Sequence, residues 1–254
     1  MKERRRFAEA LADAARAETL PRFDVGCAAD DKGGPAGFDP VTEADREAER
    51  VMRALIEAEH PDHGISGEEY GDKPASGPFS WSLDPVDGTR AFVCGMPTWV
   101  TLIALLRDDL PVLGVVDVPR LDERYVGYGE ECWLNGRPVE VSGCRSLAEA
   151  RLSTTDPFLF SGEEEAGFTR IRKAVRTARY SQDGYAYARL AAGTIDIVIE
   201  SGLKPHDYNA LIPVVRGAGG VIGDWKGGSD FPAGCVVAAA SLELFDAAIE
   251  MLNP

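Results

Sequence analysis

Three short segments of the chain concentrate carboxylates that folding alone does not require. They are Gly67-Glu68-Glu69-Tyr70-Gly71, the segment from Trp81 to Thr89, and Lys204-Pro205-His206-Asp207. In the second segment Asp84 and Asp87 lie three residues apart, and Pro85 restricts the backbone between them. Such a turn can direct both carboxylates and a carbonyl oxygen toward one point, and oxygen ligands of this kind suit hard cations such as Mg²⁺. The following Gly88-Thr89 supplies N–H groups and a hydroxyl that suit a phosphate.

Each segment on its own also has a purely structural interpretation. Asp-Pro and Asp-Gly pairs are common in turns, and two adjacent glutamates such as Glu68-Glu69 are usually a solvated charge pair. Asp207, which follows Pro205, has the residue type and position of a helix N-cap. The chemical interpretation therefore depends on the three segments meeting in space, which their spacing in the sequence does not reveal.

Periodicity indicates the elements that must position these residues. Residues 44–56 predict a clear amphipathic helix, residues 7–20 a weaker one, and residues 30–40, rich in Asp, Gly and Pro, a mobile loop. Strands are predicted at 79–83, 98–106, 112–118 and 124–128, followed by an Asn135-Gly136 hairpin. Beyond residue 145, strands (151–155, 195–200, 235–239) alternate with helices (163–173, 185–192, 207–218, 242–252). We therefore expect two layered subdomains: an α+β unit over 1–140 with most metal ligands, and an α/β unit over 141–254 with Asp207 and the specificity residues.

The composition narrows the class of protein. The 254 residues carry a net charge of −15, which disfavours binding to nucleic acid or to an anionic membrane. If the substrate is an anion, something local must reverse the sign, and a bound metal ion is the simplest candidate. No apolar stretch approaches the roughly 20 residues that span a bilayer, and the start MKERRRF lacks the apolar block of a secretory signal. Five cysteines without a CxxC pair predict reduced thiols in a cytoplasmic protein.

Four motifs, in order, resemble the inositol monophosphatase superfamily, which comprises Mg²⁺-dependent, lithium-sensitive phosphomonoesterases related to fructose-1,6-bisphosphatase. They are Asp39-Pro40-Val41-Thr42-Glu43-Ala44-Asp45, Ile65-Ser66-Gly67-Glu68-Glu69, the segment from Trp81 to Thr89, and Asp207 followed by Gly217-Ala218-Gly219-Gly220. The resemblance extends from about residue 5 to the end of the chain. It implies an α/β fold, a layered α/β/α/β/α sandwich.

The resemblance also implies a role for individual residues. Two Mg²⁺ ions would be held by Glu68, Asp84, the carbonyl of Val86, Asp87 and Asp207, with Asp84 bridging. A third, weaker ion could bind near Glu68. Mn²⁺ is an alternative metal, and Li⁺ and Ca²⁺ are expected to inhibit.

The catalytic residues that the resemblance implies are Asp45, Glu68 and Thr89. Asp45 and Thr89 match the pair that orients and deprotonates the attacking water. Gly88 and Thr89 would contact the phosphate, and Asp87 and Asp207 would lie against the substrate as well as the metal. No GxSxG motif, cysteine-based signature or HExxH spacing competes with this interpretation.

A narrower resemblance points to the histidinol-phosphate phosphatase branch. It is carried by Asp183-Gly184-Tyr185-Ala186-Tyr187 and by the Lys204-Pro205 pair. His206 stands where the inositol enzymes usually have Trp and the histidinol branch often has Tyr. Asp183 and Glu200 are the implied substrate contacts, and Glu200 could pair with an ammonium or imidazolium group. A turn or cap at Asp183 and a surface charge at Glu200 are the structural alternatives.

We therefore predict a metal-dependent phosphoric monoester hydrolase that acts on a small phosphorylated metabolite, L-histidinol phosphate, in histidine biosynthesis. The alternatives are an inositol monophosphatase, a broad sugar-phosphate phosphatase or a nucleotide 3′-phosphatase with the same site. A metal- and phosphate-binding regulator without catalysis is a further class, although a regulator need not retain Thr89. Relatives are commonly homodimers, which the resemblance leads us to expect here.

Overall fold

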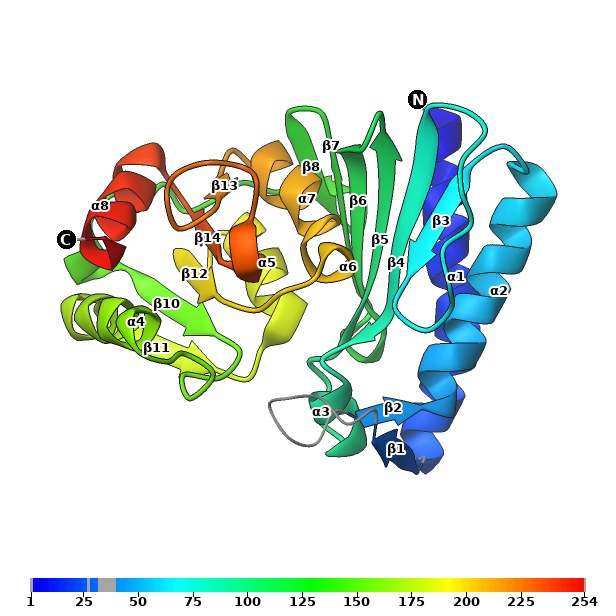
Figure 1. The fold of residues 1–254 in the computed structure, drawn as a ribbon, viewed down its shortest axis with the longest axis horizontal. Coiled ribbons are helices and arrows are strands. Elements are labelled where there is room, and N and C mark those ends of the chain that lie inside the picture. The colour runs from blue at the N-terminus through cyan, green and yellow to red at the C-terminus, as the bar shows by residue number, and fades with distance from the viewer. Residues whose placement is uncertain (1, 27, 32–39, 254) are drawn as a thin grey trace.

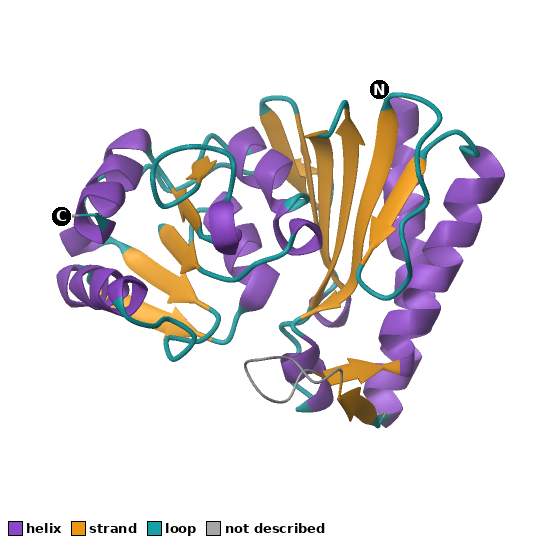
Figure 2. Ribbon diagram, in the orientation of Figure 1, coloured by secondary structure: helices purple, strands orange, loops and turns teal. Residues whose placement is uncertain are grey.

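Two β-sheets enclose a central layer of helices, and each sheet is covered on its outer face by a further pair of helices (Figure 1, Figure 2). The computed structural model describes residues 2–26, 28–31 and 40–253. The order of layers is α/β/α/β/α, as the family resemblance implied. Most of the predicted mobile loop, together with Asp39 and Cys27, lies outside the described residues.

The first sheet has seven strands in the order β3-β4-β5-β6-β7-β8-β9. Every neighbouring pair is antiparallel except β3 and β4, which run parallel. The strands are β3 (Gly64–Gly67), β4 (Phe79–Asp87), β5 (Val100–Arg107), β6 (Leu110–Val118), β7 (Glu123–Tyr128), β8 (Glu131–Leu134) and β9 (Arg137–Pro138). The predicted hairpin joins β8 to β9, and positive φ values of 48° at Asn135 and 77° at Gly136 give the turn that such pairs favour.

Helices α1 (Lys2–Val25) and α2 (Glu43–Glu59) cover the outer face of this sheet. A stripe of Phe7, Leu11 and Ala15 buries α1 against α2 and the sheet. The helix is longer than predicted and continues past Pro21 because Phe23 packs against the rings of Phe92 and Trp99. Two short strands, β1 (Ala29–Asp31) and β2 (Pro40–Thr42), pair antiparallel beside α3 (Thr89–Val93).

The second sheet has five strands in the order β11-β10-β12-β14-β13. They are β10 (Arg151–Thr154), β11 (Thr177–Tyr180), β12 (Ile197–Glu200), β13 (Val221–Gly223) and β14 (Val236–Ala239). Helices α4 (Glu163–Ala174) and α8 (Leu242–Leu252) cover its outer face, whereas α5 (Asp183–Ala191), α6 (Pro205–Tyr208) and α7 (Leu211–Gly217) lie between the sheets. Single 3₁₀ turns occur at Pro119–Leu121, Leu147–Glu149 and Pro232–Gly234. The predicted boundary between residues 140 and 141 falls between β9 and β10, and its status as a subdomain boundary stays a prediction.

The single helix predicted over residues 207–218 is wrong, because the structure has two helices there. The first begins at Pro205, and the second begins at Leu211. Pro213 has no N–H with which to continue a helix from Asn209, so it is tolerated only in the first turn of a new helix. Helix α7 then packs closely on the first sheet: a Cβ on Gly127 would collide with its backbone, and a Cβ on Gly114 would collide with the backbone of Ala210, the residue before the helix.

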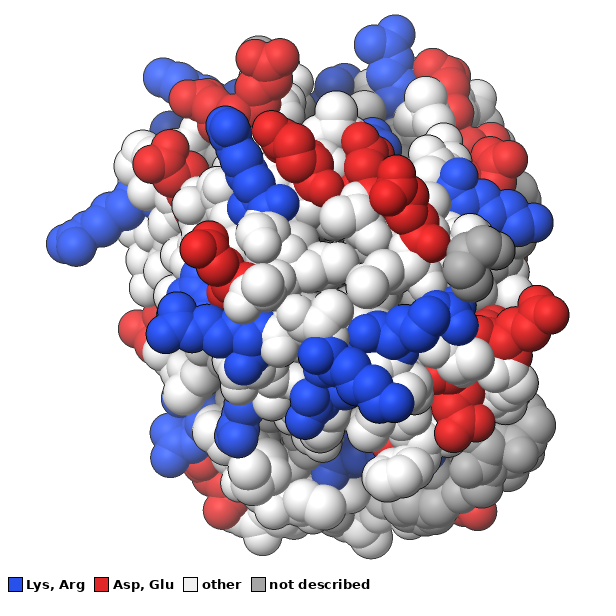
Figure 3. Space-filling view, turned by 90° about the vertical axis from the view of Figure 1, so that its left-hand side faces the viewer, with Lys and Arg blue, Asp and Glu red and all other residues white. Residues whose placement is uncertain are grey.

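Charge is unevenly distributed over the surface. Residues 166–182 contain five Lys or Arg residues and no Asp or Glu, although the chain as a whole is acidic. Figure 3 shows Lys and Arg side chains gathered in a band on the face turned toward the viewer, with acidic side chains mostly above it. Within the described part of the chain, no helix combines the length and the apolar character needed to cross a bilayer.

Candidate active site

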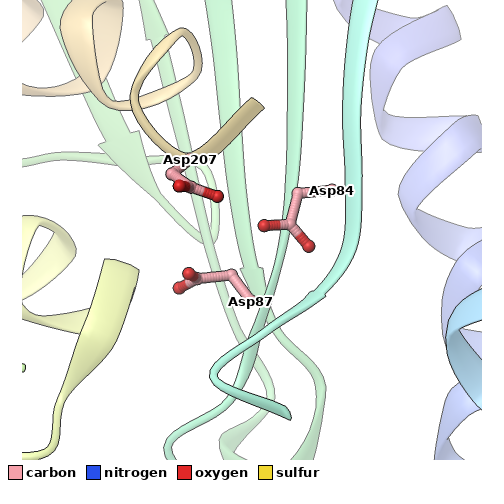
Figure 4. A group of neighbouring side chains, drawn as sticks. All are labelled: Asp84, Asp87 and Asp207. Atoms are coloured by element: carbon pink, nitrogen blue, oxygen red, sulfur yellow. The ribbon is translucent and has the colours of Figure 1, made fainter. Parts of the chain in front are cut away.

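Three predicted metal ligands from distant parts of the sequence meet at the end of β4. One carboxylate oxygen each of Asp84, Asp87 and Asp207 lies within 4.8 Å of the other two. Figure 4 shows the three side chains converging on a common space, two of them from β4 and one from α6. The fold therefore brings the second and third acidic segments of the sequence together.

A β-bulge explains how Asp84 and Asp87 reach the same face of the sheet. Residues three apart on a regular strand point to opposite faces. Here Asp84 pairs with Leu102 and Asp87 with Val100, so three steps on β4 oppose two steps on β5. The extra residue restores a common face for the two carboxylates. The predicted strand end at Leu83 is therefore wrong, because β4 continues through the bulge to Asp87.

Asp207 is anchored by the helix that carries it. It is the third residue of α6, and its Oδ2 accepts a hydrogen bond of 2.6 Å from the backbone N–H of Lys204. The residue that precedes α6 is Lys204, so Asp207 caps the helix from its third position and is not the N-cap itself. His206 lies beside it, with Nε2 at 3.4 Å from Asp207 Oδ1. The close packing of α7 on the first sheet holds this short helix over β4.

Asp45 and Thr89 lie in contact next to the carboxylates. Asp45 is buried at the start of α2, where its Oδ2 accepts hydrogen bonds from the backbone N–H (2.8 Å) and hydroxyl (2.6 Å) of Thr42. Its other oxygen, Oδ1, faces the Thr89 hydroxyl at 3.4 Å. That hydroxyl also lies 2.9 Å from the carbonyl oxygen of Val86. The arrangement leaves a carboxylate and a hydroxyl adjacent, which suits orientation and deprotonation of a water molecule.

A cavity of about 450 Å³ is lined by Thr89 and by the carboxylates of Asp84, Asp87 and Asp207, whereas the buried Asp45 does not line it. Its lining includes Glu68, which lies outside the 4.8 Å group of three, and the backbone of Gly88, whose φ of 82° suits glycine. Asp183 also lines the cavity and lies beside Gly88, since a Cβ on Gly88 would lie 3.0 Å from Asp183 Oδ2. Three basic side chains also line the cavity: Arg90, Lys204 and His206. The site thus combines carboxylates with basic side chains.

Glu200 is the one predicted substrate contact that does not line the cavity. Its buried carboxylate accepts hydrogen bonds from the backbone N–H (2.7 Å) and hydroxyl (3.0 Å) of Thr155 and from the Thr154 hydroxyl (3.2 Å). Burial raises the pKa of Glu200 to about 8. Thr155 does line the cavity, so Glu200 supports the cavity wall from behind.

The clustered carboxylates raise each other's pKa. Burial is the largest cause for Asp84, followed by the negative charges of Glu68 and Asp87. Burial also raises the pKa of Asp87, and the charges of Asp183 and Asp207 add to that effect. Burial raises the pKa of Asp183 to about 6, and the positive charge of Arg90 opposes the shift. A set of buried oxygen ligands that repel one another fits a hard divalent cation, which removes the repulsion.

Gly184 is a site residue that the motif analysis left without a role. Its backbone N–H donates a hydrogen bond of 2.6 Å to Asp87 Oδ2. A Cβ at this position would lie 2.6 Å from the same oxygen, so the contact requires glycine. The Asp-Gly pair at 183–184 was the available signal, but only the contact between the start of α5 and Asp87 at the end of β4 shows what the glycine is for.

The fold is a layered α/β sandwich, and its site gathers the carboxylates expected of a metal centre. The chain matches the inositol monophosphatase family over residues 1–253 and belongs to that family. It is 35% identical to the histidinol-phosphatase of Mycobacterium tuberculosis over 254 residues, which cover 96% of each chain. It is 49% identical to the chloroplastic bifunctional phosphatase IMPL2 of Arabidopsis thaliana over 74% of this chain, although that match spans only 55% of the plant protein.

The solved structures agree on the fold. An inositol monophosphatase from Zymomonas mobilis superposes with a TM-score of 0.88 at 39% identity, covering 100% of this chain and 98% of the other. Members of the family are phosphatases that act on small phosphorylated metabolites and are generally metal-dependent. The similar proteins carry the names of both histidinol and inositol phosphatases, so family membership alone does not select a substrate.

Proposed function

We propose that this protein hydrolyses L-histidinol phosphate with a water molecule activated by bound Mg²⁺. The observation that carries the proposal is the meeting of Asp84, Asp87 and Asp207 within 4.8 Å, beside the contact between Asp45 and Thr89. A cluster of carboxylates can serve structure alone, but the adjacent carboxylate–hydroxyl pair gives this one a means of handling a proton.

In this proposal each group has a defined task. The metal ligands are Glu68, Asp84, the carbonyl of Val86, Asp87 and Asp207, with Mn²⁺ as an alternative metal. When bound, the cations supply charge stabilisation and lower the pKa of water. Thr89 would orient that water, and the Asp45 carboxylate would accept the proton through the Thr89 hydroxyl, while the backbone of Gly88 and Thr89 would contact the phosphate. Phosphate-monoester hydrolysis is extremely slow without catalysis, so this concentration of charge matches the demand of the reaction.

The substrate assignment is supported by carboxylates beyond those needed for metal binding. Asp183 lines the cavity, and Glu200 lies directly behind its wall. A substrate with a cationic ammonium or imidazolium group gains more from the negative charge of Asp183 than a neutral polyol does. The full-length similarity to a protein named histidinol-phosphatase points the same way. Inositol 1-phosphate or a sugar phosphate is the alternative substrate, supported by the similarity to the Zymomonas mobilis protein.

The test is phosphate release from histidinol phosphate and from inositol 1-phosphate, measured with Mg²⁺, with Ca²⁺ and with EDTA. Charge-assisted hydrogen bonds contribute about 1.5–3 kcal/mol, so kcat/KM should favour histidinol phosphate by about ten- to a hundredfold per contact. EDTA should abolish turnover, and Ca²⁺ should inhibit because its flexible coordination misplaces the water. A higher kcat/KM for inositol 1-phosphate would overturn the substrate assignment, and full activity without metal would overturn the mechanism.

Two variants distinguish a role in metal binding from the general effect of removing a negative charge near the site. Asp84→Asn should lose on the order of 10³-fold in activity, since the Asp84 carboxylate would bridge two cations. Glu69→Gln changes the neighbour of Glu68 without touching a proposed ligand and should be close to wild type. Equal activities in the two variants would contradict the ligand assignment.

Glu200→Gln should reduce the difference in kcat/KM between the two substrates. An equal loss for both substrates would show that Glu200 only supports the cavity wall.

A regulator that binds metal and phosphate without catalysis is the alternative from another class. Turnover of any phosphomonoester with Mg²⁺ excludes it. The cytoplasmic location and the homodimer stay predictions, which fractionation and light scattering test.

A further inference from the structure

Helix α2 carries three charged residues on one stripe, at intervals of four residues. Asp45 belongs to the proposed site, and Glu49 and Arg53 follow it along the same side of the helix. The Glu49 side chain is 0% exposed, which is rare for a carboxylate. It lies against Gly67, where a Cβ would collide with the carboxylate. The stripe therefore runs from the proposed site to the segment that carries Glu68.

Glu49 and Arg53 bind the backbone that directly follows Glu68. The Glu49 carboxylate accepts hydrogen bonds from the N–H groups of Glu69 (2.8 Å) and Tyr70 (3.3 Å). Arg53 Nε donates to Glu49 Oε1 at 2.7 Å, and its Nη2 donates to the carbonyl oxygen of Tyr70 at 3.1 Å. One turn of α2 thus satisfies both the donors and an acceptor of residues 69–70.

The other side of Glu68 is fixed by the first sheet. Its own N–H donates to the carbonyl oxygen of Leu83 at 3.2 Å, at the end of the parallel pairing of β3 with β4. Glu68 lines the same cavity as Asp84, Asp87 and Asp207, so its carboxylate lies among like charges. Like charges at close range repel, and without a tether the Glu68 segment would move away from the other carboxylates.

We propose that Glu49 is a positioning residue that holds Glu68 in place for metal binding. The proposal rests on the proposed function, in which Glu68 is a metal ligand. Burying a carboxylate is costly unless it is fully paired. Glu49 is paired with two backbone N–H groups and one guanidinium, and all three partners serve the segment next to Glu68. A purely structural link between α2 and β3 would not need a charge, whereas a tether working against electrostatic repulsion gains from strong charge-assisted hydrogen bonds.

The test measures Mg²⁺ affinity by calorimetry on folded protein, with the free energy of unfolding measured separately without metal. Glu49→Gln keeps the shape and one acceptor, and it should raise the Kd for Mg²⁺ about tenfold, within the 10–100-fold range of outer-shell substitutions. Glu49→Ala should raise it further. Asp117→Asn is the matched control: Asp117 is equally buried, is paired with Arg16 and Arg124, and faces no proposed ligand. It should lose stability and keep its Mg²⁺ affinity within about twofold of wild type.

Comparing the Mg²⁺ affinities of Glu49→Gln and Glu68→Gln distinguishes a failure of the positioning role from a failure of the proposed function. If Glu68→Gln binds Mg²⁺ like wild type, the ligand role of Glu68 is wrong. If Glu68→Gln binds weakly while folded Glu49→Gln binds normally, the positioning role alone is overturned. The double variant should bind no more weakly than Glu68→Gln, and additive losses would show that Glu49 acts elsewhere. Should Glu49→Gln fail to fold, Arg53→Gln removes the contact to the Tyr70 carbonyl and should still raise the Kd about threefold, whereas an unchanged Kd would contradict the proposal.

Discussion

The sharpest test of the site geometry is the substitution Gly184→Ala, which adds one methyl group. The new Cβ would lie 2.6 Å from Asp87 Oδ2 and 3.1 Å from Val100 Cγ2. Because a Cβ essentially never approaches another heavy atom more closely than 3.0 Å, the carboxylate must retreat by about 0.4 Å. The movement also weakens the 2.6 Å hydrogen bond from the Gly184 N–H to this oxygen.

The substitution should weaken Mg²⁺ binding and leave the free energy of unfolding nearly unchanged. Gly184 is the second residue of α5, where alanine improves helix propensity by up to about 1 kcal/mol and offsets part of the local strain. The free energy of unfolding without metal should therefore change by less than about 1 kcal/mol. A displaced ligand loses charge-assisted contacts of about 1.5–3 kcal/mol, so the Kd for Mg²⁺ should rise about ten- to a hundredfold. Misplacement on this scale should lower kcat/KM by about 10²-fold.

Calorimetry with Mg²⁺ and a denaturant titration without metal measure the two quantities independently. Gly71→Ala is the control, because a Cβ there would have no atom within 4 Å. If Gly184→Ala binds Mg²⁺ and turns over substrate like wild type, metal binding does not depend on the position of the Asp87 carboxylate, and the reasoning is refuted. If it loses several kcal/mol of stability without metal, the glycine serves packing instead.

Three further outcomes are expected. Thr89→Ala should lower kcat by about 10²–10⁴-fold with little change in KM, as steady-state kinetics would show; an effect on KM alone would argue against a role on the water. The Tyr187 hydroxyl is buried without a hydrogen-bond partner among the described residues, so Tyr187→Phe should keep or raise the free energy of unfolding by up to about 1 kcal/mol, and a large loss would reveal a hidden partner. Glu200 has its pKa raised from 4.5 to about 8, so the folded protein binds the extra proton and metal-free stability should fall as pH rises through this interval; a rising Tm over the same range would contradict the assignment.

Local physics allowed much of the architecture to be predicted. The stripe of Ala44, Ala48, Met52 and Ile56 specifies α2, because apolar residues at this spacing lie on one face, and can be buried together, only in a helix. The Asn135-Gly136 pair specifies its hairpin, because these residues tolerate the positive φ values that the turn needs. The short strands β3, β11 and β13 escaped prediction, since three or four residues are too few to show a period.

The sequence by itself determined the chemistry of the ligands, and the tertiary structure decided how they meet. Carboxylates at 84, 87 and 207 are visible in the sequence, as is their suitability for a hard cation. Only the extra residue in β4 places Asp84 and Asp87 on one face, and only the packing of α7 on β6 and β7 carries Asp207 across to them. The role of Glu49 is likewise not visible in the sequence. Its contacts with residues 69–70 arise on folding, because hydrogen bonds between segments twenty residues apart depend on how a helix and a sheet pack.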